Sequence, residues 1–254
     1  TSGNMESIWV MQLEYDTNGG GGKYEDWTKR AWVPKYWNET GFTLCDSLGG
    51  RGLAQIVPFK WWIDEDGFYT ANDVRNSKYN IKRTWYYNNP ETPELLGKEA
   101  PVTESTWSKC TIYPVITKFF YGKTDDSPSY EGNNKDRMKF RLAETYLLLA
   151  EARIRQNNAS GAAEAINVVR KRAGAPDITA SQATMDFLLD ERIRELVGEE
   201  LRRLTLVRTG KLVERTRKYN SYSNKIDEHH ALWPIPQTII DSNTGADFPQ
   251  NTGY

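Results

Sequence analysis

Arg141-Leu-Ala-Glu-Thr-Tyr-Leu-Leu-Leu-Ala-Glu-Ala152 is the stretch that decides the fold of this chain. Its apolar residues recur at spacings of three and four, which places them on one face of a helix. They are Leu142, Tyr146, Leu149 and Ala150, followed by Ala152. The small side chains in this stretch, including Ala143, let a second helix approach closely. The sequence therefore predicts a helix that packs against a neighbour.

A second helix is predicted directly after a short connection at residues 156–160. Ser160 can cap its first turn, Glu164 lies where the helix dipole favours an acid, and Gly174 and Pro176 end it. Its apolar stripe is Ala162, Ile166, Val169 and Ala173. The two helices approach the size of a tetratricopeptide hairpin of roughly 34 residues, and one such hairpin cannot bury its own faces.

A third helical stretch opens after Thr179 or Ser181 and ends at Gly210. Gly198 lies inside it and marks either a break or a close helix contact. Its apolar residues are Met185, Leu188, Leu189, Ile193, Leu196, Val197, Leu201 and Leu204. Its charged residues are most simply a solvated face or helix-to-loop ion pairs; they are Glu191, Arg192, Arg194, Glu195, Glu199, Glu200, Arg202, Arg203 and Arg208.

The end of the chain, residues 231–241 and 248–254, is apolar and rich in proline. Pro234, Pro236 and Pro249 argue against a helix or a central strand. Leu232, Trp233, Ile235, Ile239 and Ile240 make it too apolar for a frayed tail. We therefore expect it to lie extended against a folded body.

Four pieces of this text resemble the SusD/RagB family, the glycan-capturing lipoproteins of the Bacteroidetes outer membrane. They are RLAETYLLLAEA from Arg141, AINVVRKRAG from Ala165, LLDERIRELVGEELRRLTLVRTGKL from Leu188, and LWPIPQTIIDSN with the terminal QNTGY. Their order and spacing are those of the family. One departure is Gly198-Glu-Glu-Leu-Arg-Arg203, which stands where the family usually carries a bulky aromatic pair.

The resemblance implies a mainly α, SusD-like fold with tetratricopeptide-type helix pairs, long irregular loops and a few short strands. Residues 1–136 would form the loop-rich variable region, and residues 137–254 the C-terminal helical region with its extended tail. Strands are indicated at Ile8–Tyr15 and at Thr111–Phe120. Because family members are about twice as long and carry a lipid-bearing Cys in their first half, we expect this chain to be a C-terminal half.

The composition favours binding through shape and stacking. Nine Trp and fourteen Tyr exceed what one core accommodates with every polar ring atom satisfied, so some rings should be exposed and available to sugars. The best candidate is the segment Gly19–Gly41; Trp61 and Trp62 are weaker candidates. The candidate glycan-binding residues are Tyr24, Trp27, Trp32, Tyr36, Trp37 and Asn38.

By resemblance, the function is non-catalytic binding of oligosaccharide or polysaccharide at the cell surface and delivery to a SusC-type TonB-dependent transporter. The parent protein would be held at the outer membrane by a lipid anchor that this chain lacks, and no cofactor is implied. With 33 basic and 34 acidic residues, no broad electrostatic footprint for nucleic acid exists. The alternatives are a tetratricopeptide-like protein-interaction scaffold and, third, a glycoside hydrolase.

Candidate catalytic and metal-ligating groups have simpler interpretations. Asp64-Glu-Asp66 and Asp125-Asp126 read as exposed turns, not as the paired carboxylates of a glycosidase. An EF-hand from Asp64 is excluded because Phe68 and Arg75 stand where oxygen ligands are required. His229 and His230 are adjacent and read as a solvated loop. Cys45 and Cys110 form either one bridge or two thiols, and no run is apolar enough to span a membrane.

Overall fold

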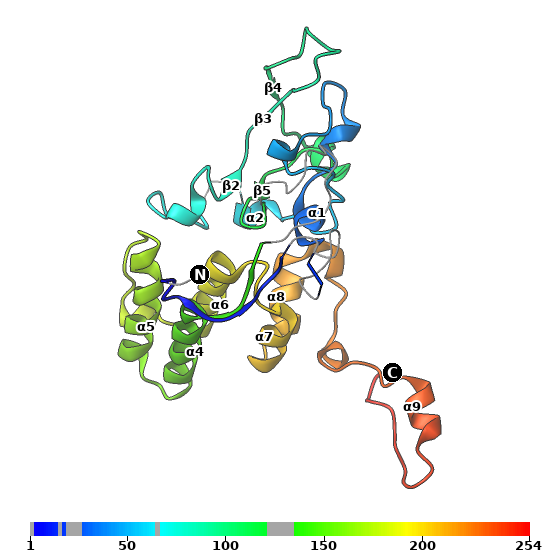
Figure 1. Cartoon of the computed structure of the whole chain (residues 1–254). Helices are drawn as coiled ribbons and strands as arrows, with labels where there is room; N and C mark the ends of the chain where they lie inside the picture. The colour runs from blue at the N-terminus through cyan, green and yellow to red at the C-terminus, as the bar shows by residue number, and fades with distance from the viewer. Residues whose placement is uncertain (1–2, 15–16, 19–26, 64–66, 121–134) are drawn as a thin grey trace. The chain divides into compact units, whose positions relative to one another are not determined.

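The chain forms two compact units, Thr1–Val197 and Gly198–Tyr254 (Figure 1). The structure, a computed structural model, describes residues 3–14, 17–18, 27–63, 67–120 and 135–254. Helices dominate and the strands are short, as the mainly α prediction requires. The division into residues 1–136 and 137–254 concerned loop content and stays a prediction.

The first unit contains six helices and six strands among its described residues. Its helices are α1 (Thr28–Trp32), α2 (Lys60–Ile63), α3 (Glu104–Ser108), α4 (Leu142–Arg155), α5 (Ala159–Arg172) and α6 (Met185–Leu196). Its strands are β1 (Ser7–Met11), β2 (Ile81–Lys82), β3 (Trp85–Tyr86), β4 (Glu99–Ala100), β5 (Val115–Ile116) and β6 (Arg137–Arg141). Single 3-10 turns lie at Tyr36–Asn38, Asp46–Leu48, Val74–Asn76 and Ala180–Gln182.

The described strands pair as three antiparallel two-stranded sheets, β1 with β6, β2 with β5 and β3 with β4. The strand predicted from Ile8 is confirmed as β1, and the one predicted at Thr111–Phe120 shortens to the two residues of β5. Trp9 and Phe140 face each other across the first sheet, with ring centroids 5.8 Å apart. Because β6 runs directly into α4, this sheet fixes where the helical region begins.

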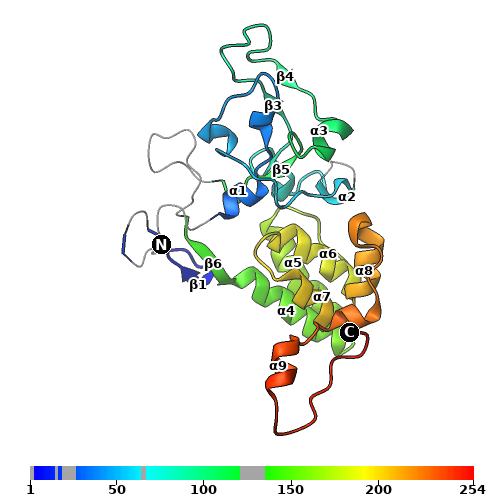
Figure 2. The same cartoon turned by 90° about the vertical axis from the view of Figure 1, so that its right-hand side faces the viewer.

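The helices α4 and α5 form the predicted hairpin and lie beside α6 (Figure 2). The turn between them uses Asn157 at φ +58, a left-handed conformation that asparagine tolerates better than most residues. The side chain of Asn158 then accepts a hydrogen bond from the Gly161 N–H at 2.9 Å and caps α5. The prediction of Ser160 as the cap is wrong, since Ser160 lies within the first turn. The apolar stripe predicted for α5 is confirmed as buried: Ala162, Ile166, Val169 and Ala173.

The predicted buried face of α4 is correct for Ala150 and Tyr146 and wrong for Leu142 and Leu149. Ala143, Leu147 and Ala150 face the core, whereas Leu142 and Leu149 are 39% and 40% exposed. The helix carries apolar residues around more than one face, so its periodicity allowed two stripes. The face with two alanines is the one that lets α5 come close.

The third stretch is two helices, α6 and, in the second unit, α7 (Arg202–Arg208). Thr184 caps α6 by accepting from the Phe187 N–H at 3.2 Å, while Thr179, expected to open it, caps the preceding 3-10 turn. Gly198, at φ +73, breaks the stretch, which was one of its two predicted roles. Gly210, at φ +68, follows the end of α7.

The charged side of α6 is buried, not solvated. Glu191, Arg192 and Glu195 are at most 3% exposed. Arg75, in the 3-10 turn at Val74–Asn76, approaches Glu191 Oε1 at 2.9 Å and Glu195 Oε2 at 3.0 Å. Helix-to-loop ion pairs were one of the two alternatives, and they hold here. We call this group the α6 ion cluster; it consists of Asp73, Arg75, Arg141, Arg170, Arg172, Glu191, Arg194 and Glu195.

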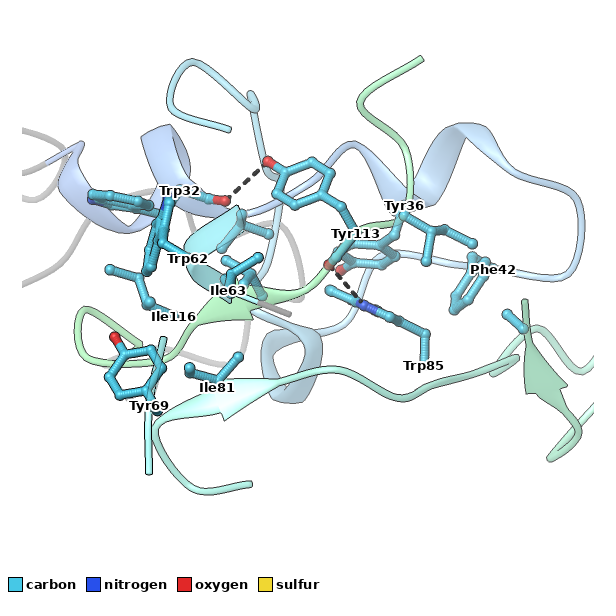
Figure 3. Packing of buried hydrophobic residues seen from close by; sticks show 14 residues of the cluster. Trp32, Tyr36, Phe42, Trp62, Ile63, Tyr69, Ile81, Trp85, Tyr113 and Ile116 are labelled. Carbon is cyan, nitrogen blue, oxygen red and sulfur yellow. Dashed lines mark hydrogen bonds between the residues drawn. The ribbon is translucent and has the colours of Figure 1, made fainter. Parts of the chain in front are cut away.

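The loop-rich part of the first unit has an aromatic core (Figure 3). The Tyr113 hydroxyl donates to the Trp32 carbonyl at 3.1 Å, and the Trp85 indole N–H donates to the Tyr113 carbonyl at 3.1 Å. Burial raises the pKa of Tyr113 well above its ordinary value. With their polar atoms bonded to backbone, such rings can be buried without an unpaired donor. The labelled members in Figure 3 are Trp32, Tyr36, Phe42, Trp62, Ile63, Tyr69, Ile81, Trp85, Tyr113 and Ile116.

The second unit consists of α7, α8 (Leu212–Tyr219), two 3-10 turns at Ser221–Ser223 and Glu228–Ala231, and α9 (Gln237–Ser242). The prediction that the proline-rich end contains no helix is wrong. Pro236 occupies the N-cap position of α9, directly before its first residue. Proline is tolerated at a helix start, where its missing N–H would have no partner. The expected burial of this segment is not observed either: Leu232, Trp233 and Ile239 are more than half exposed.

Candidate functional site

The predicted glycan-binding residues divide into core and rim. Trp32 is 5% exposed and Tyr36 is fully buried, so both rings belong to the aromatic core. Trp27 is 48% exposed, Trp37 is half-buried, and Asn38 is exposed. Tyr24 lies outside the described residues. The structure thus brings Trp27, Trp37 and Asn38 to the surface, and their role in binding stays a prediction.

Tyr36 anchors the segment that carries Trp37 and Asn38. Its hydroxyl donates to the Cys45 carbonyl and accepts from the Cys45 N–H, both at 3.0 Å. Burial raises the pKa of Tyr36 to about 12, so the hydroxyl remains a donor at neutral pH. Cys45 and Cys110 are both free thiols, which decides between the two states left open by the sequence.

Trp27 lies at the start of α1 with the Arg30 guanidinium 4.5 Å from its ring centroid. Arg30 is almost fully buried, and its Nε donates to the Arg51 carbonyl at 3.2 Å. A cation held over an indole face fixes the ring, because the pair resists rotation of either side chain. Trp27 is therefore an exposed but positioned indole.

Trp37 is held from two sides. Its indole N–H donates to the Gly52 carbonyl at 3.3 Å, and the Arg51 guanidinium lies 5.5 Å from its ring centroid. Residues 53–56 are tied to α1 through backbone hydrogen bonds from Leu53 to Arg30 and from Ile56 to Ala31, at 2.8 and 2.9 Å. The segment that contacts Trp37 is thus hydrogen-bonded to the helix that begins after Trp27, so both rings are held by one connected part of the fold.

Lysine 29 does not join this surface. Lys29 is 1% exposed and approaches Asp46 at 3.5 Å. Burial lowers its pKa, and the nearby Asp46 carboxylate partly restores it. Lys29 is one of the charged residues that alternate with the aromatic ones in this segment, and its role is structural.

The other aromatic side chains include both buried and exposed rings. Trp62 is 7% exposed, and Trp61 is half-buried with its ring perpendicular to that of Phe68, 5.2 Å between centroids. Tyr79 and Tyr86, which no pattern singled out, are 79% and 51% exposed. For Tyr86 a signal existed, since it alternates with the buried Trp85 along β3.

The described part of the chain contains no candidate metal centre. There, no group of three or more His, Cys, Asp or Glu side chains could hold a metal ion. The buried carboxyl of Glu195 has its pKa lowered to about 2, because Arg141 and Arg172 outweigh the effect of burial. An acid catalyst needs the opposite shift. Asp64-Glu-Asp66 and Asp125-Asp126 lie outside the described residues.

The two histidines serve the local turn. His230 Nδ1 accepts from the Asp227 N–H at 2.9 Å and completes a capping box, while the His229 and His230 rings lie 3.8 Å apart. Among the described helices, none has the length and apolar character needed to cross a membrane.

Comparison with known proteins places this geometry in a family. The family model described as the SusD family matches residues 5–254. A SusD-like protein of Formosa agariphila is 31% identical over 141 residues, which are 52% of this chain and 27% of that protein. The starch-binding protein SusD of Bacteroides thetaiotaomicron is 36% identical over 122 residues, 45% of this chain and 21% of that protein.

Solved structures agree with the sequence comparisons. Surface glycan-binding protein A of Bacteroides thetaiotaomicron, in complex with laminarihexaose, superposes with a TM-score of 0.61 at 23% identity. The match covers 97% of this chain and 52% of that one. This chain therefore spans about half the length of the solved proteins it matches and less of the curated ones. The predicted SusD-like fold is confirmed.

Proposed function

This chain belongs to the SusD family, and we propose on that basis that it binds oligosaccharide or polysaccharide without cleaving it. The names of similar proteins support this, since they include a starch-binding protein and a surface glycan-binding protein solved with laminarihexaose. In the parent protein, a lipid anchor would hold the chain at the outer-membrane surface, and the glycan would be bound there. The bound glycan would pass to a SusC-type TonB-dependent transporter.

The observation that carries the proposal on this chain is the exposed, positioned indole of Trp27. Sugar rings pack their C–H faces on aromatic side chains, and a ring that is already fixed loses little side-chain entropy on binding. Trp37 and Asn38 would extend the same surface, the amide of Asn38 supplying hydrogen bonds to hydroxyl groups. Tyr24, in the same segment, completes the proposed set. The buried rings of Trp32 and Tyr36 would support the segment that carries Trp37 and Asn38.

Native affinity gels test the proposal directly. We expect the chain to be retarded by at least one of several soluble polysaccharides, laminarin and starch included. Trp27→Ala should weaken binding about tenfold, because loss of one stacked ring costs about 1–1.5 kcal/mol. Tyr79→Ala is the matched control, since it removes an even more exposed ring from another loop.

Three results would contradict the proposal at different points. Equal migration in all gels would refute glycan binding by this chain. Unchanged binding by Trp27→Ala together with loss of binding by Tyr79→Ala would show that the glycan binds near Tyr79 and not near Trp27. Release of shorter sugars during incubation with the retarding glycan would show hydrolysis and refute the non-catalytic assignment.

A further inference from the structure

Arg51 lies in a glycine-rich turn whose backbone is held on both sides. Gly50 has φ +70, a left-handed conformation that favours glycine, and its N–H donates to the Cys45 carbonyl at 3.0 Å. Gly52 packs so closely that a Cβ on it would lie 2.3 Å from the Pro34 carbonyl oxygen. The turn therefore presents one long side chain, that of Arg51, from a fixed backbone.

The same arginine is connected to both rim rings of the candidate site. Its guanidinium lies 5.5 Å from the centroid of the Trp37 ring. Its carbonyl accepts a hydrogen bond from Arg30 Nε at 3.2 Å, and the Arg30 guanidinium lies 4.5 Å from the centroid of the Trp27 ring. Arg51 thus contacts one candidate glycan-binding ring directly and reaches the other through Arg30.

The side chain of Arg51 differs in role from that of Arg30. Arg30 is 4% exposed, and its guanidinium donates to the backbone of the fold. Arg51 takes part in that bond through its carbonyl, whereas Arg51 as a whole is exposed. A cation over an aromatic ring at an exposed site adds little stability. The guanidinium of Arg51 is therefore placed for recognition more than for stability.

The geometry of a guanidinium selects a carboxylate among the groups that sugars carry. A hydroxyl group binds one N–H at a time, whereas a carboxylate accepts two parallel hydrogen bonds from the planar fork. Bonds between opposite charges are also stronger than bonds between neutral groups. A uronic acid carries its carboxylate directly on a sugar ring, so one such unit offers both a face for an indole and an anion for Arg51.

The acidic side chains described between residues 27 and 56 oppose such a ligand only weakly. Glu39 accepts a hydrogen bond from the Thr111 hydroxyl at 2.6 Å. The Asp46 carboxylate lies 3.5 Å from the Lys29 ammonium. Each of these two carboxylates is partly compensated by a protein donor, which reduces its repulsion of an approaching anion.

We propose that Arg51 gives the candidate site a preference for acidic polysaccharides. The carboxylate of a uronic-acid unit receives hydrogen bonds from the Arg51 guanidinium, while a sugar ring of the same chain stacks on Trp27 or Trp37. This inference rests on the proposed function and adds the substrate class to it.

Native affinity gels with paired ligands test the preference. The probes are polygalacturonate, alginate and glucuronoxylan, each compared with its carboxyl-reduced form, in which the uronic acids have become neutral sugars. We expect at least one acidic polymer to bind about tenfold more tightly than its reduced form, because reduction removes a charge-assisted pair of hydrogen bonds. Sodium chloride should weaken binding of the acidic form and leave binding of the reduced form unchanged.

Substitution of Arg51 assigns the preference to this side chain. Arg51→Gln should weaken binding of the acidic form about tenfold and change binding of the reduced form less than about twofold. Arg208→Gln is the matched control: it lies at an exposed position of α7 in the second unit and changes the net charge of the chain equally. Arg51→Lys keeps the charge without the planar fork, so its affinity for the acidic form should fall between those of wild type and Arg51→Gln.

The possible failures separate this inference from the proposed function. Binding of neutral glycans alone, or equal binding of each acidic polymer and its reduced form, would refute the preference and leave glycan binding intact. Such a result would indicate that Glu25 and Asp26, which precede Trp27 in the sequence, balance the charge of Arg51. Equal losses for Arg51→Gln and Arg208→Gln would show general attraction of a polyanion and overturn the role of Arg51. Retardation by no glycan, acidic or neutral, would refute the proposed function itself.

Discussion

Replacing Glu195 by glutamine tests the α6 ion cluster. The Glu195 side chain is 1% exposed and receives hydrogen bonds from Arg75, Arg141 and Arg172. Arg141 and Arg172 lower its pKa from 4.5 to about 2. At about 1.4 kcal/mol per pKa unit, the folded state favours the carboxylate by about 3 kcal/mol. Loss of one partner from a buried ion pair typically costs about 3–5 kcal/mol, which agrees. We therefore expect Glu195→Gln to destabilise the first unit by about 3 kcal/mol at pH 7.

Urea unfolding followed by tryptophan fluorescence measures this loss. Eight of the nine tryptophans precede Gly198, so the signal reports mainly on the first unit. The control is Glu164→Gln, which removes an equally charged group on α5 whose side chain is 72% exposed and paired with Arg153 at 3.4 Å. Exposed pairs contribute at most about 1 kcal/mol. A loss for Glu195→Gln no larger than that of the control would refute the reasoning.

The lowered pKa of Glu195 also predicts how the effect of Glu195→Gln on the unfolding free energy changes with pH. Because the pKa of Glu195 is lower in the folded than in the unfolded chain, its stabilisation is complete above pH 4.5 and is lost as the pH falls toward 2. The difference in unfolding free energy between wild type and Glu195→Gln should shrink below about 2 kcal/mol at pH 3. A difference that stays constant from pH 7 to pH 3 would show that packing, and not charge, accounts for the effect.

Two further substitutions test local features of the fold. Asn158→Ala should destabilise α5 by about 1 kcal/mol through loss of its cap, whereas Ser160→Ala should cost nothing measurable by the same urea titration. Gly52→Ala should lower the free energy of unfolding by about 2 kcal/mol or more, because its Cβ would lie 2.3 Å from the Pro34 and Val33 carbonyl oxygens. Its control is Gly245→Ala, which should be neutral because no atom lies within 4 Å of the added Cβ. Equal effects within either pair would contradict the assigned contacts.

The three long helices of the first unit, α4, α5 and α6, were predictable, but not every buried face was. The stripe of α5 has a single apolar side, so periodicity located it correctly. The helix α4 has apolar residues on two sides, and only its packing against α5 shows that Ala143 and Leu147 face inward. Periodicity ranks hydrophobicity by angle, and it contains no information about which neighbour is present.

The burial of charge on α6 was the hardest feature to predict. Glu191 and Glu195 occur in a run that looks solvated, and their partners Arg75 and Arg141 are distant in sequence. Long-range pairing of this kind leaves no periodic signal. The prediction for the proline-rich end is wrong for a local reason. Pro236 stands before the first turn of α9, a position where proline does not break a helix.

The candidate site shows why ring density alone does not locate a binding surface. Trp27 and Trp32 are five positions apart around α1, which rotates them by about 140° relative to each other. One ring is therefore directed to solvent when the other enters the core, and the same applies to Tyr36 and Trp37 in the following 3-10 turn. The buried rings of such a cluster stabilise the fold, whereas the rim rings keep an exposed part. A glycan that binds this segment would consequently be selected by the rim rings Trp27 and Trp37, while substitutions of Trp32 or Tyr36 would alter binding only by destabilising the unit.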